Sequence, residues 1–223
     1  YDIADGDWSS DVCSSDLHVT RPGLFNSLSR TLIRLTAPGV PDTYQGEELW
    51  CFSLVDPDNR RPVDYARRSA LLRSLESDLA DSGGDPSGLL DTLEDGRAKL
   101  HLIRSLLAHR RLRPELFAQG DYLPLAAAGI RADHLCGFAR RLGSEVLVSL
   151  APRLTASLGG EAPVGAAVWQ DTRLGVPGEH WRNLLTGEAL AAEREGGRWT
   201  LRAGLALGRF PVAALERVEG AGR

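Results

Sequence analysis

The side chains best suited to chemistry gather in two stretches of the sequence. Residues 44–48 read YQGEE, and residues 56–62 read DPDNRRP. Arg60 or Arg61 could hold Asp56 or Asp58 in a bidentate pair that shapes the loop, or donate fixed N–H groups to a polar ligand. The shape-giving pair is the favoured role.

The carboxylates in this region have no second group of carboxylates predicted to lie across a substrate from them. Catalysis by two carboxyl groups needs one group on each side of the reacting bond. All five nearby carboxylates flank a single predicted strand, so we predict no catalytic residue among them. They are Asp42, Glu47, Glu48, Asp56 and Asp58.

Other reactive residue types have plainer interpretations. The five histidines form no pattern with Ser or Cys that indicates a catalytic triad, so surface or packing roles are favoured. The three cysteines have no C-x-x-C spacing and no histidine cluster beside them, which predicts reduced thiols and no metal site. We expect no cofactor. Tyr44, at a strand end, favours packing over ring stacking, and Asp58 and Asn59 suit a turn.

Periodic apolar residues predict the elements that carry these stretches. Residues 24–35 have one apolar helical face, and Ala37 to Gly39 end that helix. Val40 to Tyr44 predicts a short buried strand that runs into the first polar stretch. Residues 63–79 predict a second helix, followed by a surface connection.

A further helix follows that connection. Asp95 is its predicted cap, and Leu100, Ile103 and Leu107 form its apolar stripe. Residues 109–111 are basic, which suits the negative end of the helix dipole, and Pro114 marks the end.

After about Phe117 the pattern changes to short apolar runs separated by Gly and Pro. Such runs are typical of strands in a small antiparallel domain. We predict strands at residues 145–150, 166–169, 199–201 and 210–215. The predicted domains are therefore residues 18–118 and residues 119–223.

Composition excludes some classes of partner. The chain has 223 residues, 43% of them hydrophobic, and a net charge of -4. The first 17 residues hold five acids and no Lys or Arg, so the remainder carries 26 minus 25, or +1. Near-neutrality gives no case for nucleic acid or an anionic membrane. Neither a membrane span nor a secretory signal is visible, so we expect a cytoplasmic protein.

Residues 1–17 look foreign to the rest. Residues 7–17 read DWSSDVCSSDL, which has neither helical nor strand periodicity. The string resembles the translation of a sequencing-adapter oligonucleotide. We therefore expect residues 1–17 to be a foreign, disordered tail, and we expect residues 7–17 to pack against nothing.

Two longer strings carry a family resemblance. Residues 35–50 read LTAPGVPDTYQGEELW, and residues 52–65 read FSLVDPDNRRPVDY. Together they resemble the end of the catalytic barrel in malto-oligosyltrehalose synthases, which belong to the α-amylase superfamily. Residues 96–125 resemble the last barrel helix and the entry to the C-terminal β domain. Thr43 and Cys51 depart from the usual family residues and look like tolerated variation.

The resemblance implies a fold, a reaction and a set of binding residues. The fold would be an α+β fragment: the last helix-strand-helix portion of a (β/α)8 barrel, then a small antiparallel β-sandwich. Family enzymes convert the reducing-end α-1,4 link of a malto-oligosaccharide into an α,α-1,1 link, an isomerisation by intramolecular transglycosylation. Their catalytic carboxylates lie upstream of these strings, so this fragment alone should be inactive. The implied substrate-binding residues are Tyr44, Gln45, Glu47, Asp58, Asn59, Arg60 and Arg61.

Two other functions stay open at this point. The first is an α-glucan hydrolase of the same superfamily, which shares shorter versions of these strings. The second is a non-catalytic carbohydrate-binding β module, which would need an exposed aromatic platform among Trp169, Trp181 and Trp199.

Overall fold

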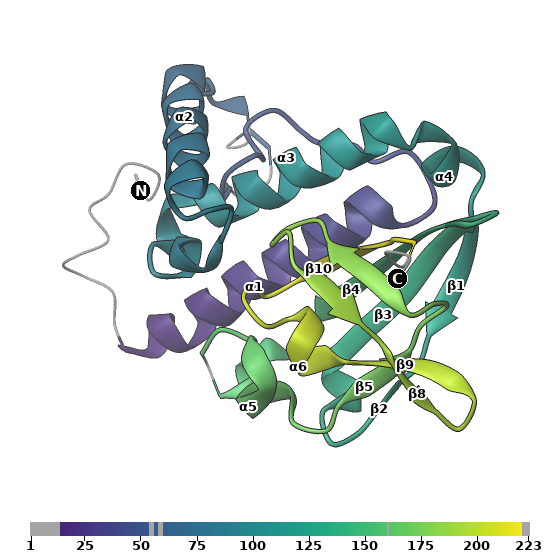
Figure 1. The fold of residues 1–223 in the computed structure, drawn as a ribbon. Coiled ribbons are helices and arrows are strands. Elements are labelled where there is room, and N and C mark those ends of the chain that lie inside the picture. Colours follow the sequence, from purple (N-terminus) through teal and green to yellow (C-terminus); the bar gives the residue numbers. More distant parts are fainter. Residues whose placement is uncertain (1–13, 54–55, 58–59, 160, 220–223) are drawn as a thin grey trace.

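A layer of helices covers one of two antiparallel sheets (Figure 1). The computed structural model describes residues 14–53, 56–57, 60–159 and 161–219. The described helices are α1 (Ser14–Thr36), α2 (Tyr65–Asp81), α3 (Arg97–Leu112), α4 (Pro114–Gln119), α5 (Gly165–Trp169) and α6 (Ala203–Ala206). Short 3-10 turns lie at Ser87–Leu90, Leu93–Asp95, Ala132–His134 and Thr155–Leu158.

The strands form two sheets in which every described pair is antiparallel. The larger sheet has the order β1-β3-β4-β10-β6-β7, and the smaller has the order β2-β5-β9-β8. The strand bounds are β1 (Asp121–Leu125), β2 (Ala127–Ala128), β3 (Leu135–Leu142), β4 (Glu145–Pro152), β5 (Arg173–Gly175), β6 (His180–Asn183), β7 (Ala189–Ala191), β8 (Glu193–Glu195), β9 (Arg198–Arg202) and β10 (Ala213–Arg217).

Strand β4 lies between two hydrophobic cores. Its residues after Glu145 are all buried, as expected for a strand that is covered on both faces. Leu147 packs in the core shared with α1 and α3, whereas Val148 and Leu150 pack in the core between the sheets. The helical layer, α1 to α4, and the β half, residues 121–219, are therefore in direct contact.

Helix α1 forms for the reason that its sequence indicates. Leu28, Leu32 and Leu35 recur at steps of three and four, and all three are fully buried. The helix runs beside α3 across one face of the larger sheet (Figure 1). It ends at Thr36, and Gly39 follows at φ 116°, a conformation that favours glycine.

A buried arginine, Arg140, anchors the C-terminal end of α1 to the larger sheet. The guanidinium of Arg140, which is 2% exposed, donates to the carbonyl oxygens of Phe117 at 3.0 Å and Gly120 at 2.8 Å. Its other terminal nitrogen lies 3.4 Å from the carbonyl oxygen of Thr36. The Ser149 hydroxyl donates to the Thr36 hydroxyl at 2.9 Å. The side chain of Arg140 on β3 thus joins α1 and α4 to the sheet.

Several predicted elements are confirmed. The helices predicted at residues 24–35 and 63–79 correspond to α1 and α2. The strands predicted at residues 145–150 and 199–201 correspond to β4 and β9, and the one predicted at residues 210–215 begins at Ala213. The change from helices to strands falls between Gln119 and Asp121. The division into two domains there remains a prediction.

The strand predicted at Val40 to Tyr44 is wrong. Residues 40–44 have no strand assignment, and Val40 is 96% exposed. A strand needs a neighbouring strand to accept and donate its backbone hydrogen bonds, and no described strand lies beside this segment. The barrel strand expected here is therefore not formed within the described residues.

The strand predicted at residues 166–169 is also wrong, because these residues lie in helix α5. A short apolar run cannot be assigned to helix or strand from its period alone. Here the helix buries Trp169 completely, and the indole N–H donates to the Pro163 carbonyl oxygen at 2.9 Å. Burial of the large ring fixes the helical turn.

Details of the third helix differ from expectation. Gly96 occupies the N-cap position with φ 85°, so Asp95 lies one residue too early to be the cap. Its carboxylate instead accepts the backbone N–H of Arg97 at 2.8 Å. Leu107 is 47% exposed and Leu106 is fully buried, so the apolar stripe passes through Leu106.

The N-terminal tail is only partly described. Helix α1 begins at Ser14, so residues 14–17 are helical. The expectation of a disordered tail does not hold for these four residues. Residues 1–13 lie outside the described residues, and the foreign origin of the tail remains a hypothesis. Among the described helices, none combines the length and the apolar character that a bilayer crossing needs.

Candidate functional site

We call the segment between α1 and α2, residues 37–64, the candidate loop. It contacts the start of α3 through Leu49 and contacts α2 through Glu48. It begins after α1 and contains the turn at residues 45–48. The Tyr44 carbonyl oxygen accepts the backbone N–H of Glu47 at 3.1 Å, which closes the turn. Gly46 has φ 90°, and an added Cβ there would lie 3.2 Å from both Arg68 and Val63. Glycine is therefore favoured at this close approach.

Both glutamates of the turn are paired with helical arginines. Glu47 accepts from Arg34 of α1 at 2.8 Å, and the same nitrogen of Arg34 donates to the Asp42 carbonyl oxygen at 2.9 Å. Glu48 accepts from Arg68 of α2 at 3.2 Å, and Arg68 also donates to the Gly46 carbonyl oxygen at 2.7 Å. These ion pairs hold the turn against two helices.

A buried lysine fixes the end of the turn. Lys99 of α3 is 6% exposed and donates to the Leu49 carbonyl oxygen at 3.0 Å. Burial lowers the pKa of Lys99, and Glu47 partly offsets this effect. The Trp50 indole N–H donates to the Leu93 carbonyl oxygen at 2.7 Å, and the Lys99 ammonium lies 5.7 Å from the Trp50 ring centroid.

Sequence reasoning missed the anchoring roles of Lys99 and Trp50. The signal for Lys99 is its position between Ala98 and Leu100 at the buried start of a helix. A buried ammonium at such a position needs an acceptor. No comparable sequence signal identifies Leu49, because its contribution is a backbone carbonyl.

Tyr44 and Gln45 are the open side chains of the turn. Tyr44 is 44% exposed and Gln45 is exposed, whereas Glu47 is half-buried. The structure therefore brings three predicted binding residues onto one turn, of which two face solvent. A phenol and an amide there can donate to and accept from a hydroxylated ligand.

The second predicted stretch is described only in part. Arg60 forms an ion pair with Asp56, and both side chains are exposed. This pair matches the shape-giving role favoured from the sequence. Arg61 is also exposed. The predicted binding residues Asp58 and Asn59 lie outside the described residues.

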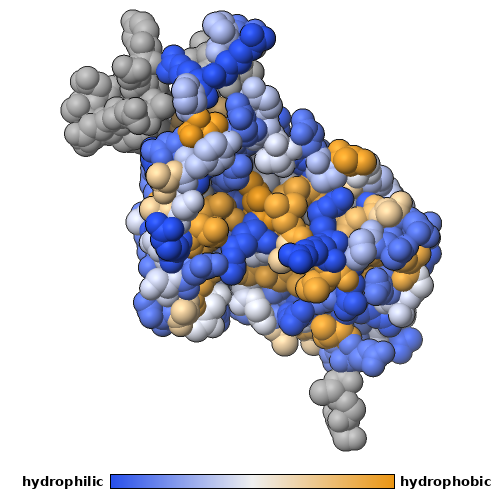
Figure 2. All heavy atoms as spheres, turned by 90° about the horizontal axis from the view of Figure 1, so that it is seen from above, coloured by the Kyte–Doolittle hydropathy of each residue, from blue (hydrophilic) through white to orange (hydrophobic). Residues whose placement is uncertain are grey.

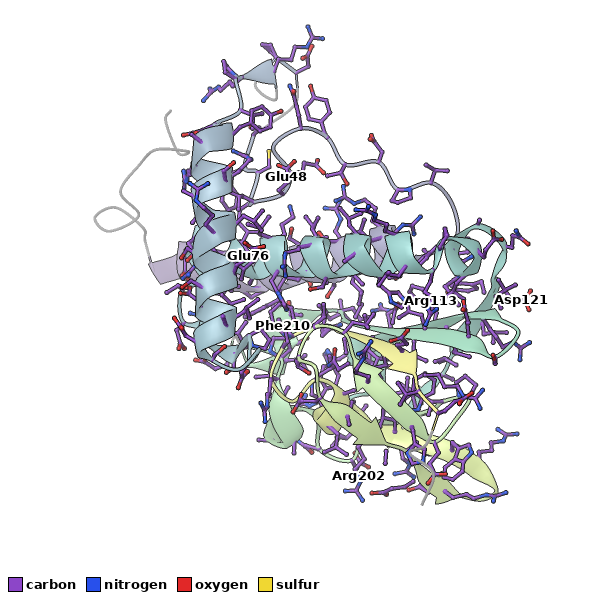
Figure 3. The ribbon with its side chains drawn as sticks, turned by 45° about the horizontal axis from the view of Figure 1, so that its top comes forward. Glu48, Glu76, Arg113, Asp121, Arg202 and Phe210 are labelled. Atoms are coloured by element: carbon purple, nitrogen blue, oxygen red, sulfur yellow. The ribbon has the colours of Figure 1, made fainter. Side chains whose placement is uncertain are left out.

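The loop and α3 leave hydrophobic side chains open to solvent. The exposed residues include Val40, Phe52, Leu107 and Leu112. Seen from above, hydrophobic residues lie between polar ones near the middle of this face (Figure 2). Glu48 projects from the loop near α2, which carries Glu76, while Arg113 lies at the far end of α3 (Figure 3).

The aromatic platform expected for a carbohydrate-binding module is not formed. Trp169 and Trp181 are fully buried, and the Trp181 indole N–H donates to the Gly178 carbonyl oxygen at 3.0 Å. Trp199 is half-buried. Two of the three rings therefore serve the core between the sheets.

Comparison with known proteins gives a consistent set of relatives. No family model matches the chain. Putative maltooligosyl trehalose synthases from two strains of Mycobacterium tuberculosis, CDC 1551 / Oshkosh and H37Rv, are 36% identical over 185 residues. The match covers 83% of this chain and 20% of those proteins.

Solved structures agree with the sequence relatives. The maltooligosyltrehalose synthase of Arthrobacter ramosus is 38% identical with a TM-score of 0.66, and the match covers 89% of this chain and 23% of that one. A noncanonic maltogenic alpha-amylase from Thermotoga neapolitana has a TM-score of 0.55 at 14% identity, covering 87% and 37%, and shows likeness of fold alone. The chain is therefore a homologue of maltooligosyl trehalose synthases that spans about a fifth of the length of the curated relatives it matches.

Proposed function

We propose that this chain is the C-terminal part of an enzyme that rearranges malto-oligosaccharides. The enzyme would convert the reducing-end α-1,4 link into an α,α-1,1 link by intramolecular transglycosylation, as part of trehalose formation. The observation that carries the proposal is the 36% to 38% identity over more than four fifths of this chain to proteins named as such synthases. Malto-oligosaccharide is the proposed substrate, and the cytoplasm is the proposed location.

The candidate loop would form one wall of the parent active site. Arg34, Arg68 and Lys99 hold the turn, which leaves Tyr44 and Gln45 open to solvent. We propose that Tyr44 and Gln45 contact substrate hydroxyls, together with Arg61 and the stretch around Asp58 and Asn59. Glu47 and Arg60 would act as positioning residues, because each is engaged in an ion pair.

The reacting carboxylates would come from other parts of the parent enzyme. Retaining transglycosylation needs a nucleophile and an acid about 5 Å apart on opposite sides of the bond. Glu47, Glu48 and Asp56 are each paired with an arginine, which leaves them poorly placed for that work. A (β/α)8 barrel takes about 250 residues, and only 118 residues of this sequence precede the predicted β domain.

The test uses the full parent enzyme, with this chain joined to the region encoded upstream of it. Incubation with maltohexaose should give a non-reducing trehalosyl product, visible by NMR at the anomeric protons. Release of reducing glucose or maltose without that product would instead support the α-glucan hydrolase, which remains the second candidate because of its shared fold.

A matched pair of variants tests the binding wall. Gln45→Ala in the joined enzyme should raise KM roughly tenfold, because it removes hydrogen bonds made in the bound state. Gln119→Ala, which changes an exposed glutamine of α4, should leave KM unchanged. Equal KM values for the two variants would remove Gln45 from the proposed wall.

A further inference from the structure

A large polar cavity lies at the opposite end of α3 from the candidate loop. Its volume is about 840 Å³, which falls within the range of about 300–1,000 Å³ of small-molecule sites. Its walls come from the end of α3, the β3–β4 turn, the segment before β6, and the ends of β9 and β10. Lys99, which contacts the loop, and His109, which lines the cavity, are ten residues apart on α3. That spacing corresponds to about 15 Å along the helix.

Glu216 organises one side of the cavity. Its side chain is 15% exposed and accepts from Arg182 at 2.8 Å, with Arg113 at 3.5 Å from the same carboxylate. Arg113 also lies 3.5 Å from the carboxylate of Glu145. These pairs join α3, β4, β6 and β10, so the polar groups are held in place before any ligand arrives. Each guanidinium carries five N–H donors, so the pairs use only part of its capacity.

The charges around the cavity nearly cancel. Three arginines line it, namely Arg113, Arg182 and Arg217. Four glutamates oppose them, and Glu145 and Glu216 are the two that are paired with Arg113. An anion such as phosphate would need an excess of positive charge. Fixed donors and acceptors with a net charge near zero instead suit a neutral ligand with many hydroxyl groups.

His109 and Trp199 also line the cavity and add an uncharged polar group and an apolar surface. His109 lines it while remaining 5% exposed, and its Nε2 has no hydrogen-bond partner among the described residues. Burial lowers the pKa of His109, so the ring is neutral at pH 7. The half-buried ring of Trp199 supplies an apolar part of the wall, and Arg194 lies 5.7 Å from its centroid. Sugars present both hydroxyl groups and apolar C–H faces to such a wall.

We propose that this cavity binds a neutral α-glucan oligosaccharide at a site separate from the candidate loop. The juxtaposition of Arg113, Arg182, Glu216 and Trp199 carries the proposal. The choice of an α-glucan among neutral hydroxylated ligands rests on the proposed function. Arg113 marks this end of α3 in Figure 3, away from Glu48 in the loop.

The test is calorimetric titration of the 223-residue chain with maltoheptaose. Trp199→Ala should weaken binding roughly tenfold or more. Because Trp199 also packs against the core between the sheets, a second variant fills the cavity instead. Ser144→Trp places a bulky ring at an exposed turn that lines the cavity and should abolish binding. Tyr122→Ala removes a 48% exposed aromatic on β1 outside the cavity and should bind as the parent chain does.

Three results would overturn the proposal. One is undetectable binding of maltoheptaose to the folded parent chain. Another is equal affinity of the parent chain and Ser144→Trp. The third is displacement of maltoheptaose by inorganic phosphate, which would indicate an anion site. Equal affinity for the β-linked cellopentaose would overturn the assignment to α-glucans.

Failure here is distinguishable from failure of the proposed function. A joined enzyme that makes no trehalosyl product, combined with cavity binding that Ser144→Trp abolishes, would overturn only the proposed function. Trehalosyl product combined with unchanged binding in Ser144→Trp would overturn only the cavity proposal.

Discussion

The β half and the helical layer differ in how far they bury their large hydrophobic side chains. Between the sheets, Trp169 and Trp181 are fully buried and their indole N–H groups are both bonded. Both halves leave some large hydrophobic side chains exposed, such as Ile130 at 68% in the β half, but the most exposed lie on the helical side, where Val40 is 96% exposed and Leu112 is 74% exposed. The β half therefore builds its core from this chain alone. The open face of the helical half fits the proposal that further polypeptide packs there in the parent enzyme.

The largest expected effect contrasts two leucines from these regions. Leu150→Ala, at a fully buried position of β4, should lower the free energy of unfolding by about 2–5 kcal/mol, because it leaves a cavity. Leu112→Ala, at the exposed end of α3, should change it by less than about 0.5 kcal/mol. Urea denaturation followed by circular dichroism measures both. Similar losses for the two variants would break the comparison.

A pair of adjacent arginines tests the junction of the two halves. Arg140→Met leaves the carbonyl oxygens of Phe117 and Gly120 without their donor and should cost about 3 kcal/mol. Arg141→Met changes a side chain that is 47% exposed and lies 3.7 Å from Asp121, so it should cost less than about 0.5 kcal/mol. Comparable unfolding midpoints would show that Arg140 is not the anchor described above.

Acid should destabilise the chain through two buried histidines. Burial lowers the pKa of His101 and His109 below the ordinary value of 6.5. The unfolded chain therefore binds more protons as pH falls through 6.5, and stability declines from there down to the folded-state pKa values. Urea midpoints at pH 7.5 and pH 5 should show this decline, and the double variant His101→Gln, His109→Gln should show a smaller one. An equal decline in both proteins would assign the effect to other groups.

The smallest effect is expected in the candidate loop. Asp56→Asn breaks an ion pair whose side chains are 52% and 70% exposed. Solvent screens such pairs, so the free energy of unfolding should change by less than about 0.5 kcal/mol. Differential scanning calorimetry checks this. A loss above about 1 kcal/mol would mean that the loop contributes to the core of the chain.

Local patterns predicted the parts of the fold whose partners lie nearby in the sequence. The spacing of Leu28, Leu32 and Leu35 predicted α1, and the apolar run at residues 145–150 predicted β4. The prediction at Val40 to Tyr44 failed because a strand depends on a neighbour that the sequence of the segment does not contain. The prediction at residues 166–169 failed because burial of Trp169 decided between two conformations that the local pattern allowed.

The candidate site was predictable in its residue types more than in their roles. Glu47 and Arg60 stood out as polar loop residues, and the structure shows each in an ion pair. The partner of Glu47 is Arg34, thirteen positions away on α1. The acceptors of Arg140 and Lys99 could not be identified from the sequence, since they are backbone carbonyl oxygens of residues at least twenty positions away.

The central claim is that this chain supplies a binding wall and leaves the reacting groups to the rest of a larger enzyme. The most direct measurement is an assay of trehalosyl product from maltohexaose with the purified chain alone and with the joined enzyme. We expect no product from the chain alone and product from the joined enzyme. Product from the chain alone that disappears on Glu47→Gln would contradict the account, because it would place the chemistry in the turn itself.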